Sequence, residues 1–272
     1  MKLFFQKMGE GPVLIILHGL YGLSDNWLSF ARKFSENFTV YLVDQRNHGR
    51  SPHSPDHSYA LMSADLVELM NSEHIEKAYL MGHSMGGKTA MHFAAMWPDK
   101  LLGLIVVDIA PAGYATTTEY SPQSITHLNI VNTLQSIDLK QFTSRTEISD
   151  ELAKTIPNTA IRQFLMKNIH REHDGSFRWK LNVDAISKSL PAMMGPVGLD
   201  KILPDRSIRE FPILFIRGGR SNYLLPEHYP EIKKYFPGAE IETIPGAGHW
   251  VHADQPEKFL TIVLQFLNQG FR

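Results

Sequence analysis

Short runs of apolar and β-branched residues recur along the chain, separated by longer segments with helical spacing. The runs that lack polar alternation lie at 13–19, 38–44, 77–83, 101–109 and 212–219. Runs of this kind are typical of strands that are buried on both faces, as in a parallel sheet. The run at 239–245 alternates between apolar and polar residues, which places it nearer the edge of the sheet.

Helical spacing appears between these runs, at 25–35, 59–71, 86–97 and 256–268. The last of these segments is preceded by Asp254, with Glu257 three residues further on, which is the pattern of a capping box. Repeated strand and helix units predict an open α/β sheet with helices on both faces.

The alternation stops between Pro111 and about Leu203. This stretch is polar, has helical patterns near 124–142, 149–170 and 183–190, and shows no convincing buried strand. A long insertion between two strands would lie over the carboxyl ends of the strands, where ligands bind in open α/β folds. We therefore expect residues 111–203 to form a helical cap on a core made of residues 1–110 and 204–272.

Composition narrows the classes of partner. The 272 residues include 27 Lys and Arg against 28 Asp and Glu, a net charge of −1, which gives no reason to expect nucleic acid or an anionic membrane as partner. Cysteine is absent, which excludes disulfides and thiolate chemistry. No signal peptide or bilayer-spanning segment is evident, so we expect a cytoplasmic protein. The sequence indicates no oligomeric state.

The sequence "GHSMGG" at 82–87 fits the pattern G-x-S-x-G between a predicted strand and a predicted helix. A tight turn there holds Ser84 in a strained conformation that projects its hydroxyl from the sheet. Gly82 and Gly86 leave room where side chains would clash with neighbouring backbone. The motif predicts that Ser84 is a nucleophile.

A serine hydroxyl needs a base, and the chain has 13 histidines. In "GAGHWVH" (246–252), His249 follows the last strand and lies at the same sheet edge as Ser84, whereas we expect His252 to pack near the last helix. In "LHGLYG" (17–22), the H-G turn is expected to aim the N–H of Leu20 at the serine, beside the N–H of Met85, as an oxyanion hole. His18 would support that loop.

These motifs occur in the order of the α/β-hydrolase family, which the chain resembles. The segments "HGLYGLSDNW" (18–27), "DQRNHGRSPHS" (44–54), "VVDIAP" (106–111) and "FRWKLNVDAI" (177–186) are similar to its YbfF-like branch of small bacterial esterases. The resemblance implies an α/β-hydrolase fold with a mostly parallel central sheet, helices on both faces and a helical cap inserted after strand 6. It also implies hydrolysis of small acyl esters or acyl thioesters, acyl-CoA among them, without a cofactor. We expect no metal either.

Most of the family carries the catalytic acid after the penultimate strand, where this chain has Asn222, which cannot stabilise an imidazolium by charge. Asp108 ends the neighbouring strand, about 4.8 Å nearer to Ser84. It keeps the chain order serine, acid, histidine, and "VVDIAP" resembles the branch that places its acid there. Glu227 is the remaining candidate, although it lies where a helix begins. Asp44 belongs to a turn and is expected to be structural.

The sequence therefore predicts a serine hydrolase in which Ser84, His249 and Asp108 form the triad. Five residues are candidates for the wall of the substrate pocket: Tyr21, Trp179, Met194, Tyr223 and Trp250. Two alternatives stay open. One is a carbon–carbon bond hydrolase or a menaquinone-pathway lyase-type enzyme on the same scaffold, against which Asn222 counts; the other is a non-catalytic binding protein, which Asn222 would suggest.

Overall fold

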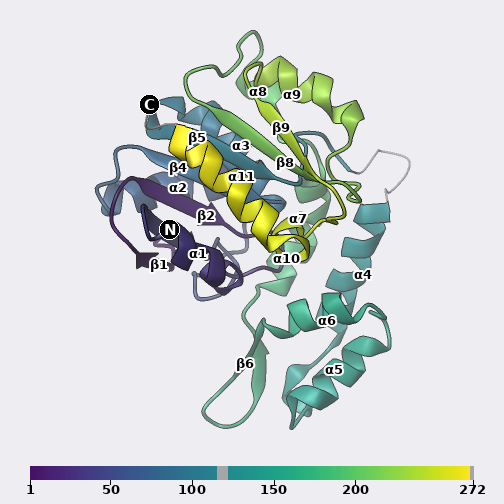
Figure 1. Ribbon diagram of the computed structural model, residues 1–272. Coiled ribbons are helices and arrows are strands. Elements are labelled where there is room, and N and C mark those ends of the chain that lie inside the picture. Colours follow the sequence, from purple (N-terminus) through teal and green to yellow (C-terminus); the bar gives the residue numbers. More distant parts are fainter. Residues whose placement is uncertain (115–121, 270–272) are drawn as a thin grey trace.

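The computed structural model describes residues 1–114 and 122–269 and is built on a seven-stranded sheet (Figure 1). The strands of this sheet are β1 (Phe5–Met8), β2 (Val13–Leu17), β3 (Thr39–Val43), β4 (Ala78–His83), β5 (Leu101–Val107), β8 (Ile213–Gly218) and β9 (Glu240–Ile244). They lie in the order β1-β3-β2-β4-β5-β8-β9, with β1 antiparallel to β3 and the other neighbours parallel. The predicted strands are confirmed, including the edge position of β9.

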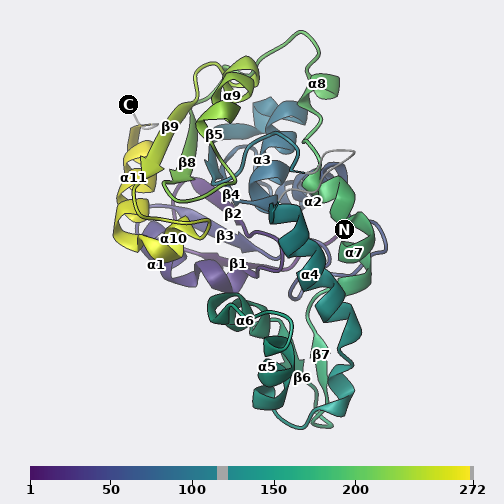
Figure 2. The same cartoon turned by 90° about the vertical axis from the view of Figure 1, so that its right-hand side faces the viewer.

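Helices cover both faces of the sheet, as Figures 1 and 2 show. Outside the insertion they are η1 (Ser24–Trp27), α1 (Leu28–Phe34), α2 (Tyr59–Ser72), α3 (Met85–Met96), η2 (Pro98–Lys100), η4 (Pro226–His228), α9 (Tyr229–Tyr235), α10 (Val251–Asp254) and α11 (Pro256–Gln269). Leu14 and Ile16 of β2 pack in the cluster that includes α1 and α11. Ile15 and Leu17 pack in the cluster that includes α2 and α3. Successive strand residues thus enter opposite cores, which is why the strands read as unbroken apolar runs.

Within the segment between β5 and β8, residues 145–179 extend away from the sheet domain, whereas residues 199–202 lie against α3 (Figure 2). We call residues 111–203 the cap. Its elements are α4 (Pro122–Ser136), η3 (Leu139–Gln141), α5 (Arg145–Ala153), α6 (Thr159–Met166), β6 (Ile169–Arg171), β7 (Phe177–Trp179), α7 (Val183–Met194) and α8 (Leu199–Ile202). The cap also contains two short strands that were not predicted: β6 and β7 pair as an antiparallel hairpin, and each has a single buried residue. Three residues are too few for a strand pattern to be recognised in a sequence.

Three further details differ from the sequence-based expectations. The insertion follows β5, the fifth strand along the chain, rather than a sixth. The edge strand β1 was not predicted, because it has no buried face to mark it. Asp254 does not begin the last helix: it closes α10, and its Oδ2 accepts the N–H of Gly248 at 2.6 Å. The capping-box prediction was therefore wrong.

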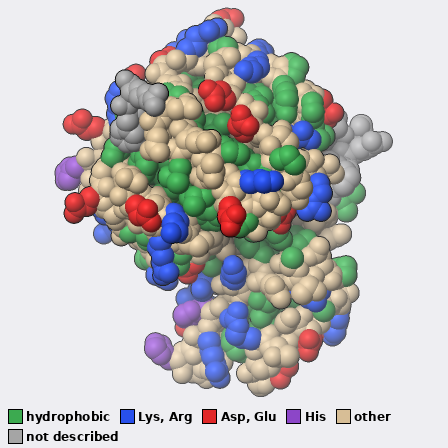
Figure 3. Space-filling view, viewed as in Figure 1, with side chains coloured by type: hydrophobic (Ala, Val, Ile, Leu, Met, Phe, Trp, Pro, Cys, Tyr) green, Lys and Arg blue, Asp and Glu red, His purple; other side chains and the backbone are tan. Residues whose placement is uncertain are grey.

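The surface in Figure 3 carries acidic and basic side chains interspersed, with neither sign gathered into one large patch on this face. This distribution agrees with the net charge of −1. Within residues 1–114 and 122–269, no helix has the length and apolar character needed to cross a bilayer.

Candidate active site

Ser84 stands in the turn between β4 and α3 with φ 53° and ψ −118°, a conformation that L-residues rarely adopt. The two flanking glycines make this turn possible. A Cβ on Gly82 would lie 2.1 Å from the carbonyl oxygen of Gly86, and one on Gly86 would lie 2.6 Å from that of His18. The Ser84 N–H donates to Val107 of β5 at 3.0 Å, which fixes the turn to the next strand. The predicted strained turn is present.

A chain of hydrogen bonds connects Ser84 to Asp108 through His249. His249 Nε2 lies 3.0 Å from Ser84 Oγ, and His249 Nδ1 lies 2.8 Å from Asp108 Oδ2. Asp108 follows directly after β5, with φ 50°, and its N–H donates to Ile216 of β8 at 2.8 Å. Two residues with positive φ, at the ends of adjacent strands, thus aim their side chains at one imidazole from both sides.

The Asp108 carboxylate is fully buried and is satisfied by three donors. Its Oδ1 accepts the N–H of Gly218 at 2.8 Å, and its Oδ2 accepts the Ser221 hydroxyl and His249 Nδ1. Hydrogen bonds of this number stabilise a buried charge that would otherwise be costly. Because an ionised carboxylate only accepts, Nδ1 carries the imidazole proton, and Nε2 presents a lone pair to Ser84.

The other positions weighed for the catalytic acid do not place a side chain on His249. Asn222 is exposed, and its backbone carbonyl accepts Gln123 Nε2 of the cap at 3.0 Å. Glu227 is exposed in the first turn of η4. Asp44 accepts the backbone N–H groups of Ser24 and Arg50, which is the structural role expected of it. The turn after β8 contributes to the site through Ser221, which the sequence reasoning missed.

His83, the last residue of β4, holds the loop that carries His249. The His83 Nε2–H donates to the backbone carbonyl of His249 at 2.9 Å, and the two rings lie 4.8 Å apart. Burial and the neighbouring His249 and His252 hold the pKa of His83 well below its usual range, so it is neutral. His252 stacks on Trp27 at 4.2 Å, and burial lowers its pKa to about 3. His252 packs as expected.

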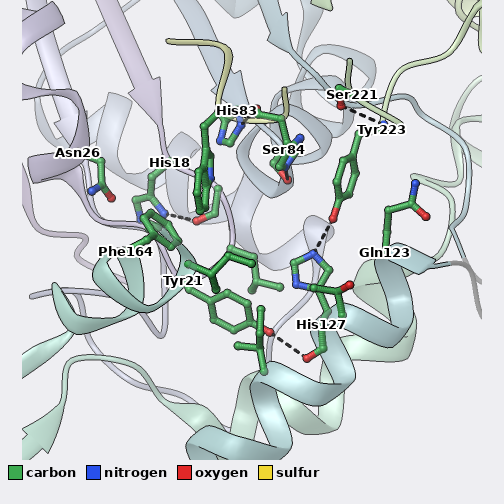
Figure 4. Close-up of a pocket in the computed structure, with 18 of the residues that line it drawn as sticks. His18, Tyr21, Asn26, His83, Ser84, Gln123, His127, Phe164, Ser221 and Tyr223 are labelled. Atoms are coloured by element: carbon green, nitrogen blue, oxygen red, sulfur yellow. Dashed lines mark hydrogen bonds between the residues drawn. The ribbon is translucent and has the colours of Figure 1, made fainter. Parts of the chain in front are cut away.

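Tyr223 connects His249 to the cap. Its ring stacks on the imidazole with centroids 3.8 Å apart and an interplanar angle of 23°. Its hydroxyl lies 3.1 Å from Nε2 of His127 on α4, and the Tyr21 hydroxyl donates to the His127 carbonyl at 3.4 Å (Figure 4). Burial lowers the pKa of His127 to about 4, so it is neutral near pH 7. His127 carries no sequence motif, and only the folded chain reveals its place.

A cavity of about 410 Å³ opens beside Ser84, between the core and the cap (Figure 4). Three of the five predicted wall residues line it: Tyr21, Tyr223 and Trp250. Met194 lines a smaller cavity of about 20 Å³ that also touches Ser84, Leu20 and Met85. Trp179 does not line either cavity: it lies in β7, paired with Ile169. The prediction for Trp179 was wrong, since an aromatic residue in a short hairpin serves the packing of the cap.

The surroundings of the predicted oxyanion donors are compatible with that role. Met85 is the first residue of α3, and the first N–H groups of a helix have no intrahelical acceptor. His18 Nε2 accepts the Gln45 N–H at 3.0 Å and thereby supports the loop that carries Leu20, as expected. Among residues 1–114 and 122–269, no group of three or more His, Asp or Glu side chains is arranged to hold a metal ion.

Comparison with known proteins adds three relatives. The family profile of the alpha/beta hydrolase fold matches residues 12–256. Over 261 residues the chain is 40% identical to the sn-1-specific diacylglycerol lipase ABHD11 of Mus musculus, covering 94% of this chain and 81% of the relative. It is 32% identical over 263 residues to esterase YbfF of Escherichia coli (strain K12), covering 97% and 96%. A solved structure, described as a marine microorganism esterase, matches with a TM-score of 0.92 at 49% identity, covering 97% of this chain and 99% of that one.

Proposed function

The chain belongs to the α/β-hydrolase family, and we propose that it is a serine esterase that cleaves small acyl esters or acyl thioesters through an acyl-enzyme intermediate. The observation that carries this proposal is the continuous hydrogen-bonded chain from Ser84 through His249 to Asp108. The Ser84 end of this hydrogen-bonded chain lies in the wall of the cavity of about 410 Å³. The similarity to an esterase and to a lipase supports an ester as the substrate class.

In the proposed mechanism, Ser84 Oγ attacks the carbonyl carbon of the substrate while His249 Nε2 takes its proton. Asp108 keeps Nδ1 protonated and stabilises the imidazolium that forms. The alcohol or thiol leaves with the proton from Nε2, and the acyl group stays on Ser84. Water, deprotonated by His249, then attacks the ester bond to Ser84 and releases the carboxylic acid.

The negative charge of the tetrahedral intermediate needs donors close to its oxygen. We assign this role to the backbone N–H groups of Leu20 and Met85, which flank Ser84 in the small cavity. Preorganised donors cost no reorganisation during the reaction, and removal of one typically slows a hydrolase about 100- to 1,000-fold. Because both donors are backbone groups, the turns that hold them matter more than their side chains.

The cavity volume favours a small substrate. About 410 Å³ lies near the lower end of the range of about 300 to 1,000 Å³ for small-molecule sites. We propose that Tyr21, Tyr223 and Trp250 contact the substrate directly and that Met194 limits the small cavity. We also propose that residues 111–203 act as a cap unit over a core of residues 1–110 and 204–272.

The experiment is a hydrolysis panel of p-nitrophenyl acetate, butyrate and octanoate, acetyl-CoA, and a 1,2-diacylglycerol, the substrate class in the name of the mouse relative. We expect turnover of the short esters, and a loss of about 10⁶-fold in kcat for Ser84→Ala, as in other serine hydrolases. Ser72→Ala, at the end of α2, is the matched control and should keep full activity. Hydrolysis that survives Ser84→Ala, or none at all by the folded wild-type protein, would overturn the proposal.

A further inference from the structure

Lys88 is a buried lysine placed one helical turn after Ser84. Lys88 lies on α3 and is only 1% exposed. Its backbone N–H donates to the Ser84 carbonyl at 3.0 Å. Lysine is almost never fully buried without a partner, because removing an ammonium from water is costly. An apolar residue would pack at this position without that cost, so the contacts of the ammonium indicate its role.

The ammonium of Lys88 contacts the chain at the start of the cap and again directly after α7. Its Nζ donates to the carbonyl of Ala112 at 2.8 Å and to that of Gly195 at 2.6 Å. The ring of Tyr114 lies 4.8 Å from Nζ and that of Tyr59 lies 5.9 Å away, both within the range of cation–π attraction. Three of these four contacts come from the two connections themselves, and the fourth comes from Tyr59, whose hydroxyl donates to the Met193 carbonyl at 2.7 Å.

The two connections, residues 111–114 and 193–197, are joined to each other. The Tyr114 N–H donates to the Met194 carbonyl at 2.7 Å, and the Val197 N–H donates to the Pro111 carbonyl at 2.9 Å. They therefore form one short double-stranded link between the core and the part of the cap that runs from α4 to α7. A cation that holds one carbonyl from each connection fixes that link to the helix that begins at the nucleophile.

We propose that Lys88 is a positioning residue: its ammonium fixes both connections of the cap to the nucleophile's helix and thereby sets how the cap lies over the cavity. This inference rests on the proposed esterase function. Both carbonyls that Nζ contacts belong to the connections, so Lys88 acts through the cap rather than on the reacting atoms. Weakening this contact should change the binding of esters that reach the cap more than the reactivity of Ser84.

Lys88 should change its protonation state near neutral pH. Burial lowers the pKa of Lys88 to about 7, against the attraction of Glu231 on α9. The other groups that face it are His228, whose pKa burial lowers, and Tyr59 and Tyr114, whose pKa values burial raises. A neutral amine donates weaker hydrogen bonds than an ammonium and gives no cation–π attraction. The link should therefore loosen as the pH rises through about 7.

The test compares wild type with Lys88→Met, which keeps the length of the side chain and removes its charge. The matched control is Lys33→Met, an exposed lysine on α1. KM and kcat are measured with p-nitrophenyl acetate and p-nitrophenyl octanoate, together with the rate of Ser84 labelling by a fluorophosphonate. Amide hydrogen exchange is followed in residues 111–114 and 193–197.

For Lys88→Met we expect KM for the octanoate to rise about tenfold to a hundredfold, the equivalent of one lost hydrogen bond to a charged group. Exchange in the two connections should accelerate by a similar factor. The rate of Ser84 labelling and kcat for the acetate should stay within about twofold. A twofold change corresponds to a free energy well below that of one hydrogen bond to a charged group. Lys88→Arg, which keeps a charge at every pH, should restore the octanoate KM in part.

Unchanged octanoate KM and unchanged exchange in Lys88→Met would overturn the proposal, as would an equal loss for acetate and for Ser84 labelling. If Lys88→Met does not fold, the wild-type protein decides. Its octanoate KM and its exchange in the connections, corrected for intrinsic exchange, should rise between pH 6 and pH 8.5, and flat profiles would overturn the idea. The exchange measurements need no activity, so they separate this proposal from a failure of the esterase assignment.

Discussion

The substitution Asp108→Asn isolates the charge of the proposed acid, because the two side chains have nearly the same shape. In the native site the Gly218 N–H donates to Oδ1, and His249 Nδ1 donates to Oδ2. The Gly218 N–H is a fixed donor, so the oxygen of the new amide should face it. The NH₂ group then faces His249, whose Nδ1 must accept. The imidazole proton moves to Nε2, where it blocks the acceptor that Ser84 requires.

The magnitude follows from this change of tautomer. The same substitution in a serine protease triad lowers kcat about 10⁴-fold, which corresponds to about 5.4 kcal/mol of transition-state stabilisation. We expect a loss of that size here. KM should change little, because no cavity wall is altered and the hydrogen bond from Gly218 is kept.

The assay is initial-rate hydrolysis of p-nitrophenyl acetate, with folding checked by circular dichroism. Glu227→Gln is the control, because that carboxylate is exposed and should contribute nothing to the rate. A kcat for Asp108→Asn within tenfold of wild type would refute the tautomer argument. A large loss in Glu227→Gln would show that the acid had been assigned to the wrong residue.

Two predictions concern stability. Gly82→Ala should lower the free energy of unfolding in urea by about 1–3 kcal/mol, because its Cβ would lie 2.1 Å from the Gly86 carbonyl oxygen. The control Gly238→Ala should be neutral, because a Cβ there meets nothing within 4 Å. Equal effects of the two substitutions would contradict the steric argument. The folded pKa values of His127, about 4, and His252, about 3, lie below the usual 6.5. The unfolded chain therefore binds more protons below about pH 6.5, so the Tm should fall progressively from pH 7 to pH 4; a Tm that stays level over this range would show that these rings are not buried neutral.

The sequence predicted the sheet and the meeting of Ser84, Asp108 and His249 for the same physical reason. Strands buried on both faces leave unbroken apolar runs, and a parallel sheet brings the ends of such runs to one edge. Ser84 and Asp108 follow two of those runs, and His249 follows the alternating edge run at 239–245, so their meeting at one edge could be expected. The absence of an aspartate at 222 was informative because only one other carboxylate followed an adjacent strand.

The parts that sequence reasoning missed depend on how the cap folds back. His127 meets the Tyr223 hydroxyl across 96 positions of the chain, and no local pattern encodes that distance. Ser221 was overlooked because a serine in a polar turn is common, although here it donates to Asp108. Trp179 was expected in the pocket wall for its residue type alone, and the short hairpin that holds it left no periodic signal.

The proposed function depends above all on Ser84 acting as a nucleophile that His249 and Asp108 activate. The most direct measurement is intact-mass and peptide-mapping analysis after brief exposure of the folded protein to a fluorophosphonate. We expect a single adduct on Ser84, formed rapidly by wild type and far more slowly by Asp108→Asn and by His249→Ala. A folded wild-type protein that acquires no adduct, or an adduct on another residue, would contradict it.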